Sequence, residues 1–213
     1  LEDYKYYFNI NINKKYFKEI LYDNLNNFQF IVDEILCGLT KINELEHNQE
    51  TQIIDDEKEK INNLNIYLNI FGTFITKTCK FYCEIILCDE IKNCLNNILV
   101  TTINKLTCNN KKKYKVTNKT NLDFNPLDIL IIFKNILLNL INTRNNEFII
   151  INIISENDSY IKNSILRFIN ILSTKDKIKS LDYSYLSLLN TKINNKLETI
   201  KAIYIEIPDE LCD

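Results

Sequence analysis

Cysteine is the residue type in this sequence that comes closest to a metal-binding pattern. Four of the seven cysteines lie near one another, at Cys79, Cys83, Cys88 and Cys94. Structural zinc sites pair their ligands at short spacings such as Cys-x-x-Cys, and many include histidine. Here successive cysteines are four, five and six residues apart, and no histidine lies near them. The spacing therefore favours reduced, mostly buried thiols in an intracellular chain over a zinc site.

Histidine and glycine are too scarce to build the other common sites. His47 is the one histidine, and it lies in the polar stretch NELEHNQETQ, where we expect it to be solvated in a loop or at a helix end. Gly38 and Gly72 are the two glycines, and neither has a second glycine at the spacing of a phosphate-binding loop. The sequence thus predicts no catalytic, cofactor-binding or metal-binding residues.

Cys212, in the closing stretch YIEIPDELCD, is the remaining candidate for a nucleophile. A reactive cysteine needs positively charged surroundings that lower the pKa of its thiol. The neighbours of Cys212 are acidic instead, at Glu206, Asp209, Glu210 and Asp213. We therefore expect Cys212 to take no part in covalent catalysis.

The charge balance gives no sign of a large anion-binding surface. The formal net charge is -2 and the pI is about 5.6, so we expect neither nucleic acid nor a membrane as a partner. The longest apolar run, 127–141, is interrupted by polar residues and is too short to span a bilayer. The loop 107–126 contains a run of lysines with one aromatic residue, Tyr114, between them, which fits a solvated loop better than an RNA-binding patch. Its lysines are Lys111, Lys112, Lys113, Lys115 and Lys119.

Helical patterns cover most of the chain. Apolar residues recur at helical spacing in 16–25 and 30–45, and longer helical patterns run from 61 to 87 and from 90 to 106. The polar stretch 46–60 is expected to be a solvated connection or the start of a helix.

A helix start is predicted at the end of the loop 107–126. Asn125 provides a side-chain cap, Pro126 suits the first helical position, and Asp128 suits the positive N-terminal end. The helix that follows, 127–141, has few polar positions. Most of its circumference is therefore expected to be buried, as in the inner layer of a helical solenoid.

The last third of the chain is also expected to be helical. We predict a buried helix at 147–155 despite its β-branched residues, because a single strand among helices would have no partner. Amphipathic helices are predicted at 160–172, capped by Asp158 or Ser159, and at 182–201. The fold class is therefore all-α, and the succession of helices with short links predicts a superhelix of the armadillo or HEAT kind.

Several stretches together resemble one family, the ubiquitin conjugation factors that elongate ubiquitin chains. Residues 26–46, NNFQFIVDEILCGLTKINELE, are similar to a family pattern in which an acidic pair is flanked by spaced leucines. Residues 88–106 are similar to a family segment with Pro-Glu-Ile, Arg-Leu-Ala and a leucine-rich helix. Near Leu25 and Asn26 this chain is shorter than the family pattern. The matching residues in the first stretch are Asp33, Glu34, Leu36, Leu39 and Ile42.

The strongest resemblance lies in 112–140, which follows a family pattern of Leu-Lys-Val, an Asn-Pro-Glu-Lys loop, an aromatic residue, Phe-x-Pro and a helix. The matching residues here are Lys115, Val116, Asn118, Lys119, Phe124 and Pro126. Residues 147–172 resemble the next family segment through Phe148, Asp158, Ser159 and Tyr160. The closing IPDELCD is similar to the opening of the family's U-box through Ile207, Pro208, Asp209, Glu210 and Asp213.

The resemblance covers nearly the whole chain and implies an armadillo-like core at 1–202, followed at 203–213 by a linker and the first residues of a U-box. In this family the U-box binds a ubiquitin-conjugating enzyme, whose thioester supplies the chemistry. The parent protein would then be a ubiquitin-protein transferase, and this chain alone would be inactive. The implied partners of the core are ubiquitylated substrates and the valosin-containing segregase ATPase, for proteasomal degradation in the cytoplasm and the nucleus. No cofactor is implied. The alternative is a helical-repeat protein-interaction adaptor without ligase activity.

Overall fold

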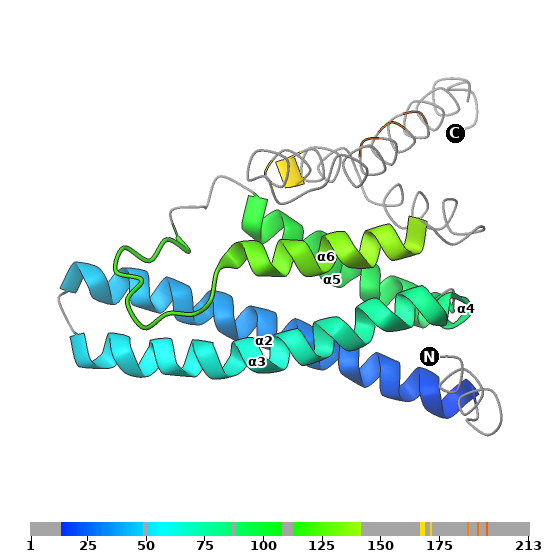
Figure 1. The fold of residues 1–213 in the computed structure, drawn as a ribbon, viewed down its shortest axis with the longest axis horizontal. Coiled ribbons are helices and arrows are strands. Elements are labelled where there is room, and N and C mark those ends of the chain that lie inside the picture. Colours follow the sequence, from blue (N-terminus) through cyan, green and yellow to red (C-terminus); the bar gives the residue numbers. More distant parts are fainter. Residues whose placement is uncertain are drawn as a thin grey trace, which may run out of the picture. The chain divides into compact units, whose positions relative to one another are not determined.

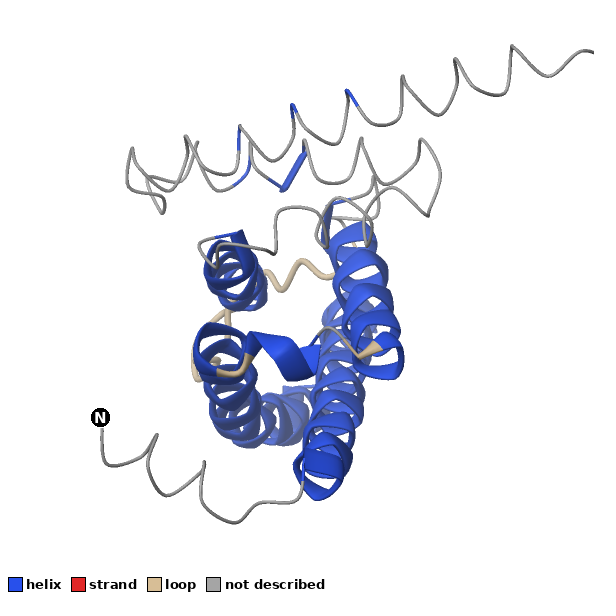
Figure 2. Cartoon of the chain, turned by 90° about the vertical axis from the view of Figure 1, so that its right-hand side faces the viewer, coloured by secondary structure: helices blue, strands red, loops and turns tan. Residues whose placement is uncertain are grey.

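The computed structural model describes residues 14–48, 51–86, 88–107 and 113–141, together with the isolated positions 167, 168, 171, 187, 191 and 195. The described residues form the helices α2 (Lys14–Asn48), α3 (Thr51–Phe81), α4 (Cys83–Ile86), α5 (Asp89–Thr107) and α6 (Pro126–Ile141). These residues contain no strand, and Figures 1 and 2 show helices joined by loops. The all-α prediction is confirmed, and the long consecutive helices are those of a helical solenoid.

Two compact units make up the chain, Leu1–Ile98 with Lys113–Phe124 and Leu99–Lys112 with Asn125–Asp213. Apart from the isolated positions, the predicted helices 147–155, 160–172 and 182–201 lie outside the described residues, as does the predicted linker and U-box start at 203–213. No described helix combines the length and the apolar composition needed to cross a bilayer.

The first unit is built on α2 and α3, which run side by side (Figure 1). Buried residues recur along α2 every three or four positions, from Leu21 through Leu25 and Phe28 to Val32. This stripe keeps one face of the helix against the core without a gap. The helical patterns predicted at 16–25 and 30–45 therefore belong to one helix, and α2 passes through Leu25 and Asn26 without a break.

Gly38 marks a close approach of α2 to α3. A Cβ added there would lie 3.0 Å from Cδ1 of Ile61 and 3.0 Å from Oε1 of Glu57. Glu57 and Lys58 are only 8% and 2% exposed, so the stretch 46–60 is not the solvated connection that the sequence allowed. The other expectation for this stretch, a helix start, is confirmed because α3 begins at Thr51.

The structure breaks the predicted helix 61–87 at Tyr82. Helical geometry stops at Phe81 and resumes in the short α4. Backbone hydrogen bonds from Ile85 N to Tyr82 O (3.0 Å) and from Cys88 N to Ile85 O (3.2 Å) tighten this turn. The ring of Tyr82 packs against Phe17 of α2, with the ring centroids 5.5 Å apart. The break thus lies beside this aromatic pair, in a stretch that has no glycine or proline.

In the second unit, α6 begins as predicted. The Asn125 side chain accepts a hydrogen bond from the Leu127 N–H at 3.1 Å, and the Asp128 carboxylate accepts one from the Asn125 N–H at 3.3 Å. Pro126 is the first helical residue. Among the described side chains of α6, only Asn135 is exposed, so the prediction of a helix buried around most of its circumference is confirmed.

Candidate protein-interaction site

The cysteines form no metal site within the described part of the chain. Cys79 is buried, Cys88 and Cys94 are half-buried and Cys37 is exposed, and none of these four forms a disulfide. The prediction of mostly buried thiols is therefore wrong for this set, because Cys79 alone of the four is buried. No group of three metal-ligating side chains gathers among the described residues. The side chains of His47, Cys83, Cys108 and Cys212 lie outside the described set.

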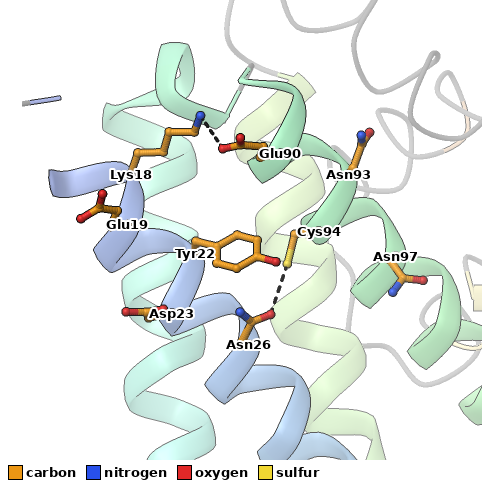
Figure 3. Close-up of a pocket in the computed structure, with 9 residues that line it drawn as sticks. All are labelled: Lys18, Glu19, Tyr22, Asp23, Asn26, Glu90, Asn93, Cys94 and Asn97. Carbon is orange, nitrogen blue, oxygen red and sulfur yellow. Dashed lines mark hydrogen bonds and ion pairs between the residues drawn. The ribbon is translucent and has the colours of Figure 1, made fainter. Parts of the chain in front are cut away.

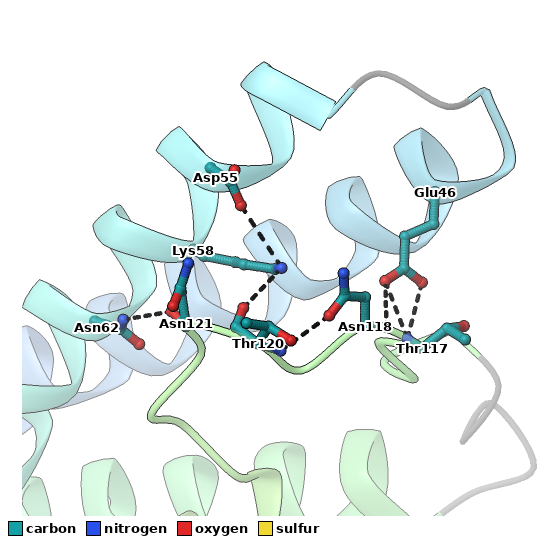
Figure 4. A network of polar contacts seen from close by, with 8 residues as sticks. All are labelled: Glu46, Asp55, Lys58, Asn62, Thr117, Asn118, Thr120 and Asn121. Atoms are coloured by element: carbon teal, nitrogen blue, oxygen red, sulfur yellow. Dashed lines mark hydrogen bonds and ion pairs between the residues drawn. The ribbon is translucent and has the colours of Figure 1, made fainter.

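The lysine-rich loop is docked on the C-terminal part of α2 (Figure 4). The Glu46 carboxylate accepts hydrogen bonds from the backbone N–H groups of Thr117 (2.8 Å) and Asn118 (2.9 Å). Asn43 donates to the carbonyl of Lys115. Partial burial alone would raise the pKa of Glu46, but the N–H groups of Asn118 and Thr117 outweigh it and lower the pKa below its usual 4.5. Glu46 is therefore a charged anchor for the loop backbone.

α3 holds the second half of the same loop. Lys58 donates to the Thr120 carbonyl at 2.9 Å. Asn62 donates to the Asn121 carbonyl and accepts from the Asp123 N–H, both at 2.9 Å. Asn121 has a φ of 63°, in the left-handed region that asparagine tolerates better than most residues. The loop backbone is thus held along α3 at Thr120, Asn121 and Asp123, the first two of which Figure 4 shows.

Apolar contacts complete this docking. Val116 and Phe124 are each 4% exposed, while the side chains of Lys113, Lys115 and Lys119 are exposed. The prediction of solvated lysines is confirmed for these three side chains. Residues 113–124 of the loop nevertheless belong to the first unit, because their backbone groups are hydrogen-bonded to α2 and α3 and the side chains of Val116 and Phe124 are buried.

A groove of about 1110 Å³ lies between the N-terminal part of α2 and the first turns of α5 (Figure 3). At one end, Lys18 Nζ lies 2.6 Å from Glu90 Oε2, and this bond raises the pKa of Lys18. Further along, the Cys94 thiol donates to Asn26 Oδ1 at 3.7 Å, and burial raises the pKa of Cys94. These two contacts connect α2 with α5, which form the two walls of the groove.

Two of the stretches that resemble the elongating family contact each other. In 26–46, Leu36 and Leu39 lie in the core, and Glu46 at the end of this stretch binds Asn118 at 2.9 Å. Asn118 belongs to the stretch 112–140. A family model, the ubiquitin elongating factor core, matches residues 9–194.

The chain belongs to the ubiquitin elongating factor family. A comparison with curated proteins found no match. The matched span contains every described helix, so the docked loop and the groove are both parts of the elongating factor core. Family membership supports a role in ubiquitin chain elongation, as the resemblance implied.

Most residues of both sites were not predicted from the sequence. Cys94 of the groove was noted only as one member of a cysteine cluster. In the loop, the lysines and Val116, Asn118 and Phe124 were named, but Glu46, Lys58 and Asn62, which hold the loop, were not. A local signal for the groove did exist, because Glu19 and Asp23 are four residues apart on α2, and so are Asn93 and Asn97 on α5. Residues at this spacing lie on the same helical face. That α2 and α5 meet at these faces depends on the tertiary fold.

Proposed function

We propose that this chain is the helical scaffold of a U-box ubiquitin ligase that elongates ubiquitin chains. The observation that carries the proposal is the match of residues 9–194 to the ubiquitin elongating factor core. The closely packed α2–α3 pair and the loop anchored to it by Glu46, Lys58 and Asn62 support a role as a rigid mount. Such a mount would hold the U-box and its bound conjugating enzyme near the end of a growing chain.

The chemistry of transfer is assigned to the conjugating enzyme. Its thioester carbonyl is attacked by a lysine amine of the substrate or of the last ubiquitin, and the enzyme's thiolate leaves. The core therefore needs no nucleophile of its own, in line with the non-catalytic role expected for Cys212. The resemblance of 207–213 to the opening of a U-box supports this division of labour. On this proposal the 213-residue chain alone elongates no chains.

The partners proposed for the scaffold are ubiquitylated substrates and the valosin-containing segregase ATPase. The proposed pathway is proteasomal degradation, with the cytoplasm as the main location and the nucleus as the second. These assignments rest on the family alone. A pull-down with monoubiquitylated substrate or with the segregase tests each of the two proposed partners.

A reconstituted elongation assay tests the proposal. Activating enzyme, conjugating enzyme, ubiquitin, ATP and a monoubiquitylated substrate are combined with the full-length parent, with the parent lacking its U-box, or with the 213-residue chain. Long chains are expected with the full-length parent alone. A full-length Cys212→Ser variant is the matched control and should retain full activity. Chain elongation by the 213-residue chain, or loss of activity in Cys212→Ser, would overturn this account of where catalysis takes place.

A further inference from the structure

The groove between α2 and α5 carries an excess of negative charge. Glu19 and Asp23 line it from adjacent turns of α2, and like charges at this spacing repel each other. Among the side chains that the structure describes, no lysine or arginine forms an ion pair with either. Lys18 is the one cation among the described residues of the lining, and it is already paired with Glu90 at 2.6 Å. A positively charged ligand would relieve the repulsion between Glu19 and Asp23.

The polar side chains of the groove also fit a peptide backbone. Asn26, Asn93 and Asn97 line it, and each amide carries both a donor and an acceptor. An extended peptide offers N–H and C=O groups that are not paired within its own backbone, whereas a helix has already paired most of its own. Tyr22 is 43% exposed and lies between the two walls (Figure 3), where its ring offers a face to a cation.

The charged side chains of the groove are spread out, with Glu19 and Asp23 on one wall and Glu90 on the other (Figure 3). A ligand with several separated positive charges matches this distribution.

We propose that the groove binds an extended, lysine- or arginine-bearing peptide segment of a partner protein. The basic side chains pair with Glu19 and Asp23, and the amide of Asn93 bonds to the peptide backbone. This binding is separate from ubiquitin transfer and from the U-box, so it can be present or absent whatever the outcome of the elongation assay.

Fluorescence anisotropy tests the binding. The probe is a labelled nine-residue peptide of alternating lysine and serine, titrated with the 213-residue chain at low and at moderate salt. We expect saturable binding that weakens with salt. The Glu19→Gln, Asp23→Asn double variant should weaken it about fivefold to tenfold, since exposed ion pairs each contribute a modest amount. The matched control is Asp56→Asn with Glu59→Gln, which neutralises two exposed acids of α3 and should leave affinity unchanged.

Cysteine alkylation locates the peptide without any substitution. Cys94 lines the groove, whereas Cys37 is exposed on α2 outside it. Saturating peptide should slow the alkylation of Cys94 severalfold and leave that of Cys37 unchanged, as measured by mass spectrometry of the digested chain.

Several results would overturn the proposal. They are the absence of saturable binding, equal weakening in the groove and control variants, and unchanged alkylation of Cys94 in the presence of peptide. Equal binding of a glutamate–serine peptide would remove the role of charge. Equal competition by spermine would assign the groove to small polycations instead of a peptide segment.

Discussion

Replacing Gly38 tests whether the close approach of α2 and α3 is a requirement of the fold. An added Cβ would lie 3.0 Å from Ile61 Cδ1, 3.1 Å from Ile61 Cγ1 and 3.0 Å from Glu57 Oε1. Carbon atoms pack best at about 3.5–4.0 Å. Ile61 is fully buried, and Glu57 is held by Lys41 at 2.6 Å. Neither side chain can move aside without losing packing or straining this ion pair.

Two effects oppose each other in Gly38→Ala. Alanine is favoured over glycine inside a helix by about 0.5–1 kcal/mol. Overpacking of a filled core costs about 1–3 kcal/mol. We expect the second effect to win, so that Gly38→Ala lowers the free energy of unfolding by about 1 kcal/mol. Gly38→Leu adds further carbons at the same contact and should lower it by about 3 kcal/mol.

Urea unfolding followed by far-UV circular dichroism measures both losses. Cys37→Ala, at the adjacent exposed position, is the control and should change the free energy of unfolding by less than about 0.5 kcal/mol. Ile61→Val removes the Cδ1 atom that the added Cβ would meet. Gly38→Ala combined with Ile61→Val should therefore lose about 0.5–1 kcal/mol less than the sum of the two single losses. A Gly38→Leu variant as stable as the wild type, or additive losses in the pair, would refute the steric argument.

Three further substitutions test the polar anchors. Glu46→Gln should lower the free energy of unfolding at pH 7 by about 1 kcal/mol. Because folding lowers the pKa of Glu46, the charged carboxylate stabilises the folded state fully above pH 4.5, its ordinary pKa, and this stabilisation is lost as the pH falls further. The urea midpoints of wild type and variant should therefore converge in acid. Lys58→Met removes the donor to the Thr120 carbonyl at 2.9 Å and should cost about 1 kcal/mol in thermal unfolding, whereas an unchanged midpoint would contradict this role. Asn125→Ala removes the cap on Leu127 at 3.1 Å and should cost about 1 kcal/mol, with Asn125→Asp close to wild type; equal losses in both would argue against capping.

Local signals in the sequence were enough to predict some elements in detail. The start of α6 depends on Asn125, Pro126 and Asp128, which act on backbone groups within one turn, so no distant contact is needed to foresee it. The buried circumference of α6 follows equally from its own composition. The helical patterns at 16–25 and 30–45 left 26–29 unassigned because this stretch is mostly polar, although Phe28 continues the buried stripe at 1% exposure.

The features that the sequence did not predict depend on contacts between distant residues. Glu57 and Lys58 are charged, so their pattern indicates a solvated stretch, yet Lys41 and the Thr120 carbonyl provide partners for them when they are buried. The end of α3 at Phe81 likewise coincides with the packing of Tyr82 against Phe17. The residue pattern of 46–60 gives no sign of the contacts with Lys41 and Thr120, and the pattern of 61–87 gives no sign of the contact with Phe17. The groove was missed for the same reason, since its two walls come from separate helices.

The two sites occupy different parts of α2, and this separates their roles. The groove contacts Asn26 and the docked loop contacts Asn43, which are about 25 Å apart along a helix that rises 1.5 Å per residue. Substitutions this far apart, with no shared partner, are expected to act independently. Glu46→Gln should therefore loosen the loop and lower stability while leaving peptide affinity unchanged, and the groove variant should do the reverse. If Glu46→Gln weakened peptide binding as much as the groove variant, α2 would transmit strain along its length, and the groove could not be treated as an independent binding site.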